Sequence, residues 1–197
     1  MDATDPSVSA CTRCPALVES RSRIVNGVGP TDAELVIVGE APGAKEDEQG
    51  EPFVGRSGQL LDEVLRDSGL DRSAARITNC VRCRPPDNRN PHADELEQCR
   101  EWLHGELLAI DPAVILTVGK VPASHLLGRD VPVTAEAGTI QRIAIGESTY
   151  PVVICVHPAA VLYDRSQEER LREAVAVAAA QIGIRPTNDA QPRLDEF

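Results

Sequence analysis

Several kinds of residue are scarce in this chain, and each scarcity limits the kinds of site or structure that the protein can have. Only 3% of the 197 residues are aromatic, so a site that needs a ring must use one of two Phe, two Tyr or one Trp. No apolar run approaches the roughly 20 residues of a membrane-spanning helix. Residues 1–5 are mostly polar and acidic and lack the basic and apolar regions of a signal peptide. We therefore expect a cytoplasmic protein with no membrane partner.

Lysine is nearly absent, since Lys45 and Lys120 are the two lysines among 20 basic residues. The formal net charge is −11, which disfavours nucleic acid as a partner, because DNA affinity comes largely from Lys and Arg that neutralise phosphates. Net charge does not describe one local face, however, so a strip of arginines on an acidic body stays compatible with DNA. The acidic, Arg-rich composition indicates either a halophile with a high-salt cytoplasm or a GC-rich genome.

Apolar runs alternate with helical patterns along the chain. The length suits one domain, which we place at residues 11–184, between a flexible segment 1–10 and a disordered tail 185–197. Helices are expected at 15–20, 58–68, 94–110, 122–127 and 168–182, and strands at 34–38, 76–81, 113–118, 139–145 and 150–156. Segment 40–57 is expected to be irregular. This order predicts an α/β fold, a three-layer α/β/α sandwich with a short, mostly parallel central sheet.

The six cysteines indicate metal or redox chemistry before disulfides, because a cytoplasmic chain is kept reduced. Two C-x-x-C pairs stand at 11–14 and 80–83, and a further cysteine falls on the helix expected at 94–110. A set of thiolates without His suits tetrahedral zinc or a [4Fe–4S] cluster. The residues alone leave open whether the fourfold set is Cys11, Cys14, Cys80 and Cys83, as in a zinc ribbon, or includes Cys99.

Polar signals follow three of the expected strands. The run G-E-A-P-G at 39–43 follows the first strand, Asn79 ends the second, and His157 follows the last. Ligands of parallel sheets bind at the carboxyl ends of the strands, so these signals are expected to share one edge. Each also has an ordinary structural interpretation, Asn79 as a turn cap and His157 as a buried structural histidine.

In their order and spacing, these motifs resemble the iron–sulfur uracil-DNA glycosylases, family 4 of that superfamily. The similarity covers roughly residues 11–183 and rests on C-T-R-C at 11–14, G-E-A-P-G-A-K-E-D at 39–47, P-F-V-G-R at 52–56, T-N-C-V-R-C-R-P-P at 78–86, E-Q-C-R-E-W at 97–102 and H-P-A-A at 157–160. It implies an enzyme that flips uracil out of DNA and hydrolyses the N-glycosidic bond, leaving an abasic site for base excision repair.

The resemblance also implies a cofactor, one [4Fe–4S] cluster per chain. Its ligands would be Cys11, Cys14, Cys83 and Cys99. The two remaining cysteines, at 80 and 155, would then be small buried hydrophobes, and Cys80 should point away from its neighbour Asn79 because strand side chains alternate.

The resemblance assigns roles around the base. Phe53 would lie under uracil, and the Asn79 carboxamide would pair with O4 and N3–H together. His157 would donate to O2 as negative charge builds up on the departing base, with help from the backbone N–H of Ala41.

The loop after the first strand departs from the better-known family 1. Glu40 belongs to the water-activating loop, but Ala41 stands where family 1 has an Asp, so no strong general base is expected. Gly43 likewise replaces an aromatic that excludes the methyl group of thymine, and Glu46 is the expected substitute.

The expected partner is uracil-containing DNA, single- or double-stranded. A basic strip of Arg56, Arg82, Arg84 and Arg89 would contact phosphates. Residues 160–162 would fill the space of the flipped base, with Leu162 as the favoured wedge. We expect a monomer, with a sliding clamp as a candidate protein partner.

Two other interpretations stay open. The first is a protein of the same fold that traps uracil-DNA covalently through a His on an inserted basic loop; this chain lacks the insertion, although His92 occupies that loop. The second is a metal-stapled binding or electron-transfer module. Such a module would not depend on Phe53, Asn79 or His157, so alanine substitutions there would leave its activity intact.

Overall fold

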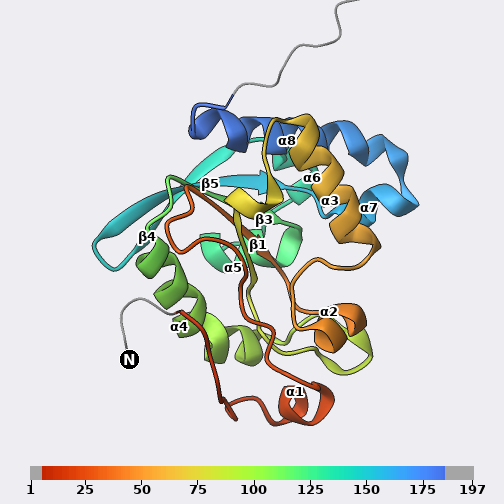
Figure 1. Cartoon of the computed structure of the whole chain (residues 1–197), viewed down its shortest axis with the longest axis vertical. Helices are drawn as coiled ribbons and strands as arrows, with labels where there is room; N and C mark the ends of the chain where they lie inside the picture. The colour runs from red at the N-terminus through yellow and green to blue at the C-terminus, as the bar shows by residue number, and fades with distance from the viewer. Residues whose placement is uncertain (1–5, 185–197) are drawn as a thin grey trace, which may run out of the picture.

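The structure, a computed structural model, describes residues 6–184 and is built on one five-stranded sheet with the order β2-β1-β3-β5-β4 (Figure 1). Four strands are parallel: β1 (Leu35–Gly39), β2 (Arg76–Asn79), β3 (Val114–Val118) and β5 (Ser148–Cys155). Strand β4 (Ile140–Ile145) pairs antiparallel with β5 at one edge. The predicted α/β fold with a mostly parallel sheet is confirmed.

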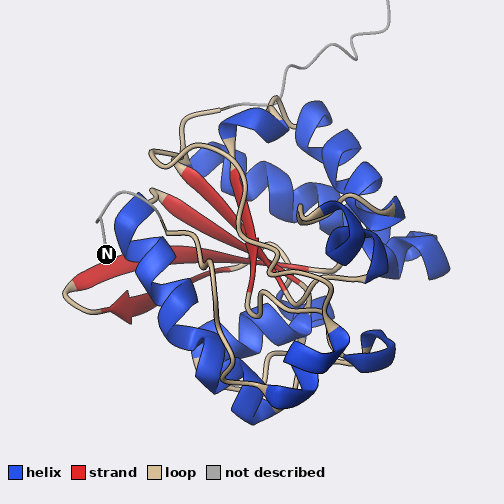
Figure 2. Cartoon of the chain, turned by 60° about the horizontal axis from the view of Figure 1, so that its bottom comes forward, coloured by secondary structure: helices blue, strands red, loops and turns tan. Residues whose placement is uncertain are grey.

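Helices cover both faces of the sheet, and the alternation of side chains along β1 explains why (Figure 2). Leu35 and Ile37 pack with α3 (Arg56–Asp67) and α8 (Glu168–Gln181), whereas Val36 and Val38 pack with α4 (Ala93–Ile110) and α5 (Lys120–Leu127). A strand buried on both faces reads as a continuous apolar run, which is the pattern that the sequence shows. No helix within residues 6–184 is long and apolar enough to cross a membrane.

Several short elements were not predicted. The segment expected to be irregular contains α2 (Ala44–Gln49), which Gly50 ends at a φ of +86°. The helices α6 (Val133–Glu136) and α7 (Pro158–Tyr163) were also missed, whereas α1 (Pro15–Ser20) was expected. Elements of four to six residues are too short to show a helical period, so their sequences resemble turns. Three 3₁₀ turns complete the described chain, at Arg72–Ala74, Pro86–Asn88 and Arg165–Gln167.

The N-terminal segment forms hydrogen bonds where the structure describes it. Val8 is buried, its N–H donates to Asn26 Oδ1 at 2.8 Å, and the Asn26 amide donates back to the Val8 carbonyl at 3.2 Å. These hydrogen bonds join Val8 to the rest of the domain, and the flexibility of residues 1–10 stays a prediction. Residues 1–5 and the tail expected at 185–197 lie outside the described residues.

A buried ionic network fastens β2 and the loop after it to α4. The Glu106 carboxylate accepts from Arg76 Nε, from Arg82 Nη2 and from Thr78 Oγ1, each at 2.8 Å. All four residues are buried. Gly27 passes close by, because a Cβ there would lie 2.2 Å from Glu106 Oε1. The network pairs the Glu106 carboxylate with two guanidinium groups, and an unpaired carboxylate at this buried position would be costly.

Candidate active site

A pocket opens beside the carboxyl ends of β1, β2 and β5. Its lining consists of Glu40, Ala41, Gly43, Glu46, Phe53, Ser57, Asn79 and His157. The cavity volume is about 180 Å³, below the roughly 300–1,000 Å³ of sites that take drug-sized ligands, so the pocket suits a single small ring system. The fold thus brings together every residue that the sequence placed around the base.

Ser57 is the lining residue that the sequence analysis missed. It lies in the first turn of α3, just after the N-cap residue Gly55. A serine between two glycines in a stretch rich in Gly and Pro looks like ordinary turn chemistry, so nothing local marks it.

Phe53 forms one wall in a strained backbone conformation. Its φ is +54°, in the left-handed region that non-glycine residues rarely adopt. Arg72 holds this loop by donating to the Pro52 carbonyl at 2.7 Å and to the Phe53 carbonyl at 3.2 Å. The Phe53 and His157 rings are stacked, with centroids 5.9 Å apart and an interplanar angle of 26°.

Asn79 presents an amide that no side chain or backbone group of residues 6–184 binds. It is the last residue of β2 and only 4% exposed, yet no described residue hydrogen-bonds its carboxamide. Buried amides are normally satisfied, so an unused one beside a cavity is free to bind a ligand. Gly39 is needed here, because a Cβ would lie 2.4 Å from Asn79 Oδ1 and 2.6 Å from the Phe53 ring.

Two carboxylates stand at the pocket in different environments. Glu46, on α2, accepts from the Val54 N–H at 3.1 Å and the Gly55 N–H at 3.0 Å through Oε1, so its orientation is fixed. Gly43 allows the close approach of the other oxygen, since a Cβ there would lie 2.8 Å from Glu46 Oε2. Burial raises the pKa of the Glu40 carboxyl, which makes Glu40 a better proton acceptor than an exposed carboxylate.

His157 is held as a neutral ring. It is the N-cap of α7, and its Nδ1 accepts from the Ala159 N–H at 3.1 Å. Burial lowers the pKa of His157, and the nearby Glu46 carboxylate opposes that shift. Because Nδ1 is an acceptor, the single proton of the neutral imidazole is on Nε2, which is therefore a hydrogen-bond donor.

The four cysteines of the expected ligand set come from three parts of the chain: Cys11 and Cys14 precede α1, Cys83 follows β2, and Cys99 is on α4. Cys14, Cys83 and Cys99 pack around Leu17 and Val81. Cys11 lies close enough to Cys14 and Cys83 to raise the pKa of each thiol, although burial is the main cause of both shifts. Burial raises the pKa of Cys14 and of Cys99 to about 11, so each would lose its proton on binding a metal.

Arg21 binds the same region. Its Nη1 donates to Cys83 Sγ at 2.8 Å and its Nη2 to the Cys11 carbonyl at 2.7 Å. We call residues 11–23 the cysteine arm. Within residues 6–184, no three His, Cys, Asp or Glu side chains converge closely enough for a single metal ion. A single zinc would need sulfurs about 4 Å apart, whereas a cubane cluster binds thiolates around a larger inorganic body.

The other two cysteines are fully buried in the core, although Cys80 lies close enough to Cys99 for that thiol to raise its pKa, after the larger effect of burial. Cys80 is fully buried and packs with Val38 and Leu103 on the α4 face of the sheet, pointing away from Asn79 as predicted. Cys155 is fully buried in the core on the opposite face. The zinc-ribbon alternative, which requires Cys80, therefore does not fit the structure.

The expected arginine strip is only partly available to DNA. Arg82 is 2% exposed and bound to Glu106, so the prediction that it contacts DNA is wrong. Arg89 forms a two-pronged ion pair with Glu95 at 2.8 and 2.7 Å, and Arg84 donates to Asn88. Arg56 is exposed at the start of α3.

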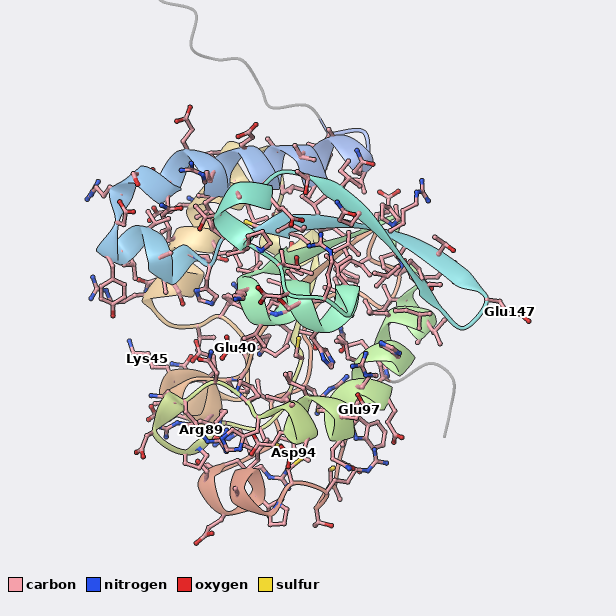
Figure 3. The ribbon with its side chains drawn as sticks, turned by 180° about the vertical axis from the view of Figure 1, so that it is seen from behind. Glu40, Lys45, Arg89, Asp94, Glu97 and Glu147 are labelled. Atoms are coloured by element: carbon pink, nitrogen blue, oxygen red, sulfur yellow. The ribbon has the colours of Figure 1, made fainter. Side chains whose placement is uncertain are left out.

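Lys45 was overlooked by the sequence analysis as a surface cation. It is exposed on α2, and Figure 3 shows it on the same side of the molecule as Glu40 and Arg89. Its signal was its position in the G-E-A-P-G-A-K-E-D motif, directly before Glu46.

The expected wedge lies on α7. Val161 is buried, which excludes it, whereas Leu162 is 43% exposed. The next residue, Tyr163, is 93% exposed and lies outside the expected wedge. His92, the residue of the covalent-trap alternative, caps α4 and is not in the pocket lining.

Comparisons with known proteins identify the family of this chain. The family model described as the uracil DNA glycosylase superfamily matches residues 26–180. A type-4 uracil-DNA glycosylase of Archaeoglobus fulgidus is 39% identical over 79% of this chain and 80% of its own length. The type-4 enzyme of Thermotoga maritima is 39% identical over 86% of this chain and 87% of its own. That of Pyrobaculum aerophilum is 40% identical over 79% and 81%. The chain therefore belongs to the uracil-DNA glycosylase superfamily and, within it, to the type-4 enzymes.

Proposed function

We propose that this protein is a uracil-DNA glycosylase that removes uracil from DNA and leaves an abasic site for base excision repair. The observation that carries the proposal is the unused Asn79 carboxamide in a small pocket walled by Phe53 and His157. An amide both donates and accepts, so it matches uracil O4 and N3–H, whereas cytosine offers the opposite pattern. The type-4 relatives carry the name of this activity.

In this mechanism the extruded base lies against Phe53, and the polar groups around it act on charge. As the glycosidic bond breaks, uracil leaves as an anion with charge on O2. The His157 Nε2–H and the Ala41 backbone N–H donate to that oxygen and stabilise the leaving group. The sugar becomes oxocarbenium-like and is attacked by water, which Glu40 orients. The neutral state of His157 supports this role, since its Nδ1 is already engaged by Ala159.

Thymine is excluded by Glu46 in this proposal. The carboxylate is fixed by two backbone N–H groups and approaches Gly43 closely. A methyl group on C5 of the base would meet this rigid polar wall, whereas hydrogen would not. Ser57 is a further polar group of the lining that a bound base would meet.

We further propose one [4Fe–4S] cluster on Cys11, Cys14, Cys83 and Cys99. The grouping of these thiols and the Arg21 hydrogen bond to Cys83 support it, because cations and hydrogen bonds stabilise cluster thiolates. When bound, the cluster would cross-link the cysteine arm to the loop after β2 and to α4.

The DNA surface in this proposal surrounds the pocket. Arg56, Arg84, Arg89 and Lys45 would face phosphates, with the pairing of Arg89 to Glu95 reducing its share. Leu162 would fill the gap left by the base. That the chain acts as a monomer in the cytoplasm, with a sliding clamp as a candidate partner, stays a prediction.

Excision of uracil from a labelled oligonucleotide tests the function, with Asn79→Asp as the informative variant. We expect the parental protein to release uracil and not cytosine. A carboxylate at 79 cannot donate to O4 but can accept from the amino group of cytosine, so the variant should lose uracil excision and gain cytosine excision. A parental protein that releases no uracil, or that stays covalently joined to the DNA, would refute the proposal.

A further inference from the structure

A buried carboxylate links the cysteine arm to α2. Asp47 is 3% exposed, and both of its oxygens accept from the Ser22 N–H at 2.9 Å, while Oδ1 also accepts from the Arg23 N–H at 3.3 Å. Among residues 6–184 no Lys, Arg or His forms an ion pair with it. A carboxylate that is buried without a cation is costly, so its hydrogen bonds to the arm must offset that cost.

The arm residues that Asp47 holds are next to those that bind the cysteines. Arg21, directly before Ser22, donates to Cys83 Sγ at 2.8 Å and to the Cys11 carbonyl at 2.7 Å. Three consecutive residues, 21–23, therefore contact two of the cysteines on one side and Asp47 on the other. Displacing the arm would move both sets of contacts together.

On its other side Asp47 adjoins the pocket. The preceding residue, Glu46, lines the cavity and fixes the loop that follows Phe53 by accepting from the Val54 and Gly55 N–H groups. The helix α2 has only six residues and ends at Gly50. Isolated helices of this length are not stable, so contacts such as those of Asp47 must hold α2 in place.

We propose that Asp47 is a positioning residue that couples the order of the cysteine arm to Glu46 and so to the shape of the uracil pocket. The inference rests on the proposed function of that pocket. Asp47 does not touch the base, and its effect would pass through Glu46. The coupling gives the arm a consequence at the active site although its cysteines are not part of the pocket lining.

The test compares Asp47→Asn and Asp47→Ala with Glu48→Gln. Glu48 is the exposed neighbour on the same helix, so its variant removes the same charge without touching the arm. Single-turnover excision over a range of enzyme concentrations separates the binding constant from the maximal rate. We expect both Asp47 variants to weaken the apparent affinity for uracil-DNA by about tenfold, the loss typical of one charge-assisted hydrogen bond, with the maximal rate nearly unchanged. Discrimination against thymine should fall as well, and Glu48→Gln should match the parent.

Amide hydrogen exchange supplies a readout that needs neither uracil nor iron. Coupling predicts faster exchange in the Asp47 variants at Ser22 and Arg23 and also at Val54 and Gly55, whose N–H groups Glu46 binds. Faster exchange at 22–23 alone, with the parental affinity and thymine discrimination, would show a local brace and overturn the inference. If the parental protein excises no uracil, the proposed function fails, while the exchange at Val54 and Gly55 still decides the coupling.

Discussion

The proposed uracil pocket and the cysteine arm lie next to each other but are held in place by different kinds of contact. The pocket residues follow strands of the central sheet, whose side chains form a large apolar core on each of its two faces. Gly39 allows Phe53 and Asn79 to approach the backbone closely. The arm has only a small apolar cluster, with Leu17, Val81 and Cys83 as its buried members. Hydrogen bonds made by Arg21 and Asp47 also hold the arm. A segment with so little core needs a covalent or metal staple, whereas the pocket is preorganised by the sheet.

The largest effect is expected from breaking the staple. Cys99→Ser should remove the iron–sulfur colour and lower the iron content from about four per chain to near zero, because one of four thiolates is lost. Amide protection should fall across residues 11–23 and stay unchanged in β1 and β3, whose bonds lie in the core. Iron analysis, the visible spectrum and hydrogen exchange measure this.

Cys155→Ser is the matched control. Cys155 is fully buried in the core and away from the other thiols, so its variant should lose stability but keep the iron. A parental protein that is colourless and binds one zinc would contradict the cluster.

The second largest effect is expected from a change in the pocket that leaves the cysteine arm intact. His157→Ala should slow single-turnover excision about a hundredfold, on the order of 3 kcal/mol, because the lost donor acts on charge that develops as the base leaves. Binding to uncleavable uracil-DNA and the iron content should change little. His104→Ala, outside the pocket lining, serves as the control. Excision at the parental rate by His157→Ala would mean that this histidine is structural.

The smallest effect is expected in the pH dependence of the unfolding free energy, which should differ between the sheet and the region around the cysteine arm. On the sheet side, burial lowers the pKa of His125 from its ordinary 6.5 to about 4, and its Nε2 is buried without a partner. Between those two pH values the unfolded chain binds a proton that the folded chain does not, so stability falls as the pH drops through this window. Between about pH 6.5 and pH 5 the expected loss is on the order of 2 kcal/mol. His125→Gln should flatten this part of the profile of unfolding free energy, measured with urea.

Near the cysteine arm, the stability that the Arg89–Glu95 ion pair contributes should be lost at lower pH. The Arg89 guanidinium lowers the pKa of Glu95 below its ordinary 4.5, so the stability from this pair is present above that pH and is lost as the pH falls through the depressed value.

The two pH windows can be separated with the His125→Gln variant. If this variant and the parent lose the same stability between about pH 6.5 and pH 5, the assignment of that window to His125 is contradicted.

Much of the architecture was readable from local patterns. The strands β1 and β3 and the second half of β5 are nearly continuous apolar runs, which is how strands buried on both faces look. Their order also placed Asn79 and His157 at the same edge of the sheet, since parallel strands end together. The helices α2 and α7 were not readable, because six residues give no period and a motif rich in Gly and Pro resembles a turn.

The burial of individual arginines could not be predicted from the sequence. Arg82 and Arg84 are two residues apart and looked alike, yet one is buried on Glu106 and the other is partly exposed. The partner that separates them, Glu106, is 24 residues from Arg82. No local pattern predicts which charge will find a distant carboxylate.

By itself, the sequence determined the fold class, the strands and the types of residue at the pocket, because these depend on hydrophobic alternation and on motifs whose spacing is local. Only the tertiary structure decided which side chains are free. Within residues 6–184 it left the Asn79 carboxamide without a hydrogen-bond partner, set His157 as a donor through Nε2, and buried Asp47 between the arm and α2. These properties depend on hydrogen bonds and close contacts between segments far apart in the chain, and such bonds form only when the packed core brings those segments together.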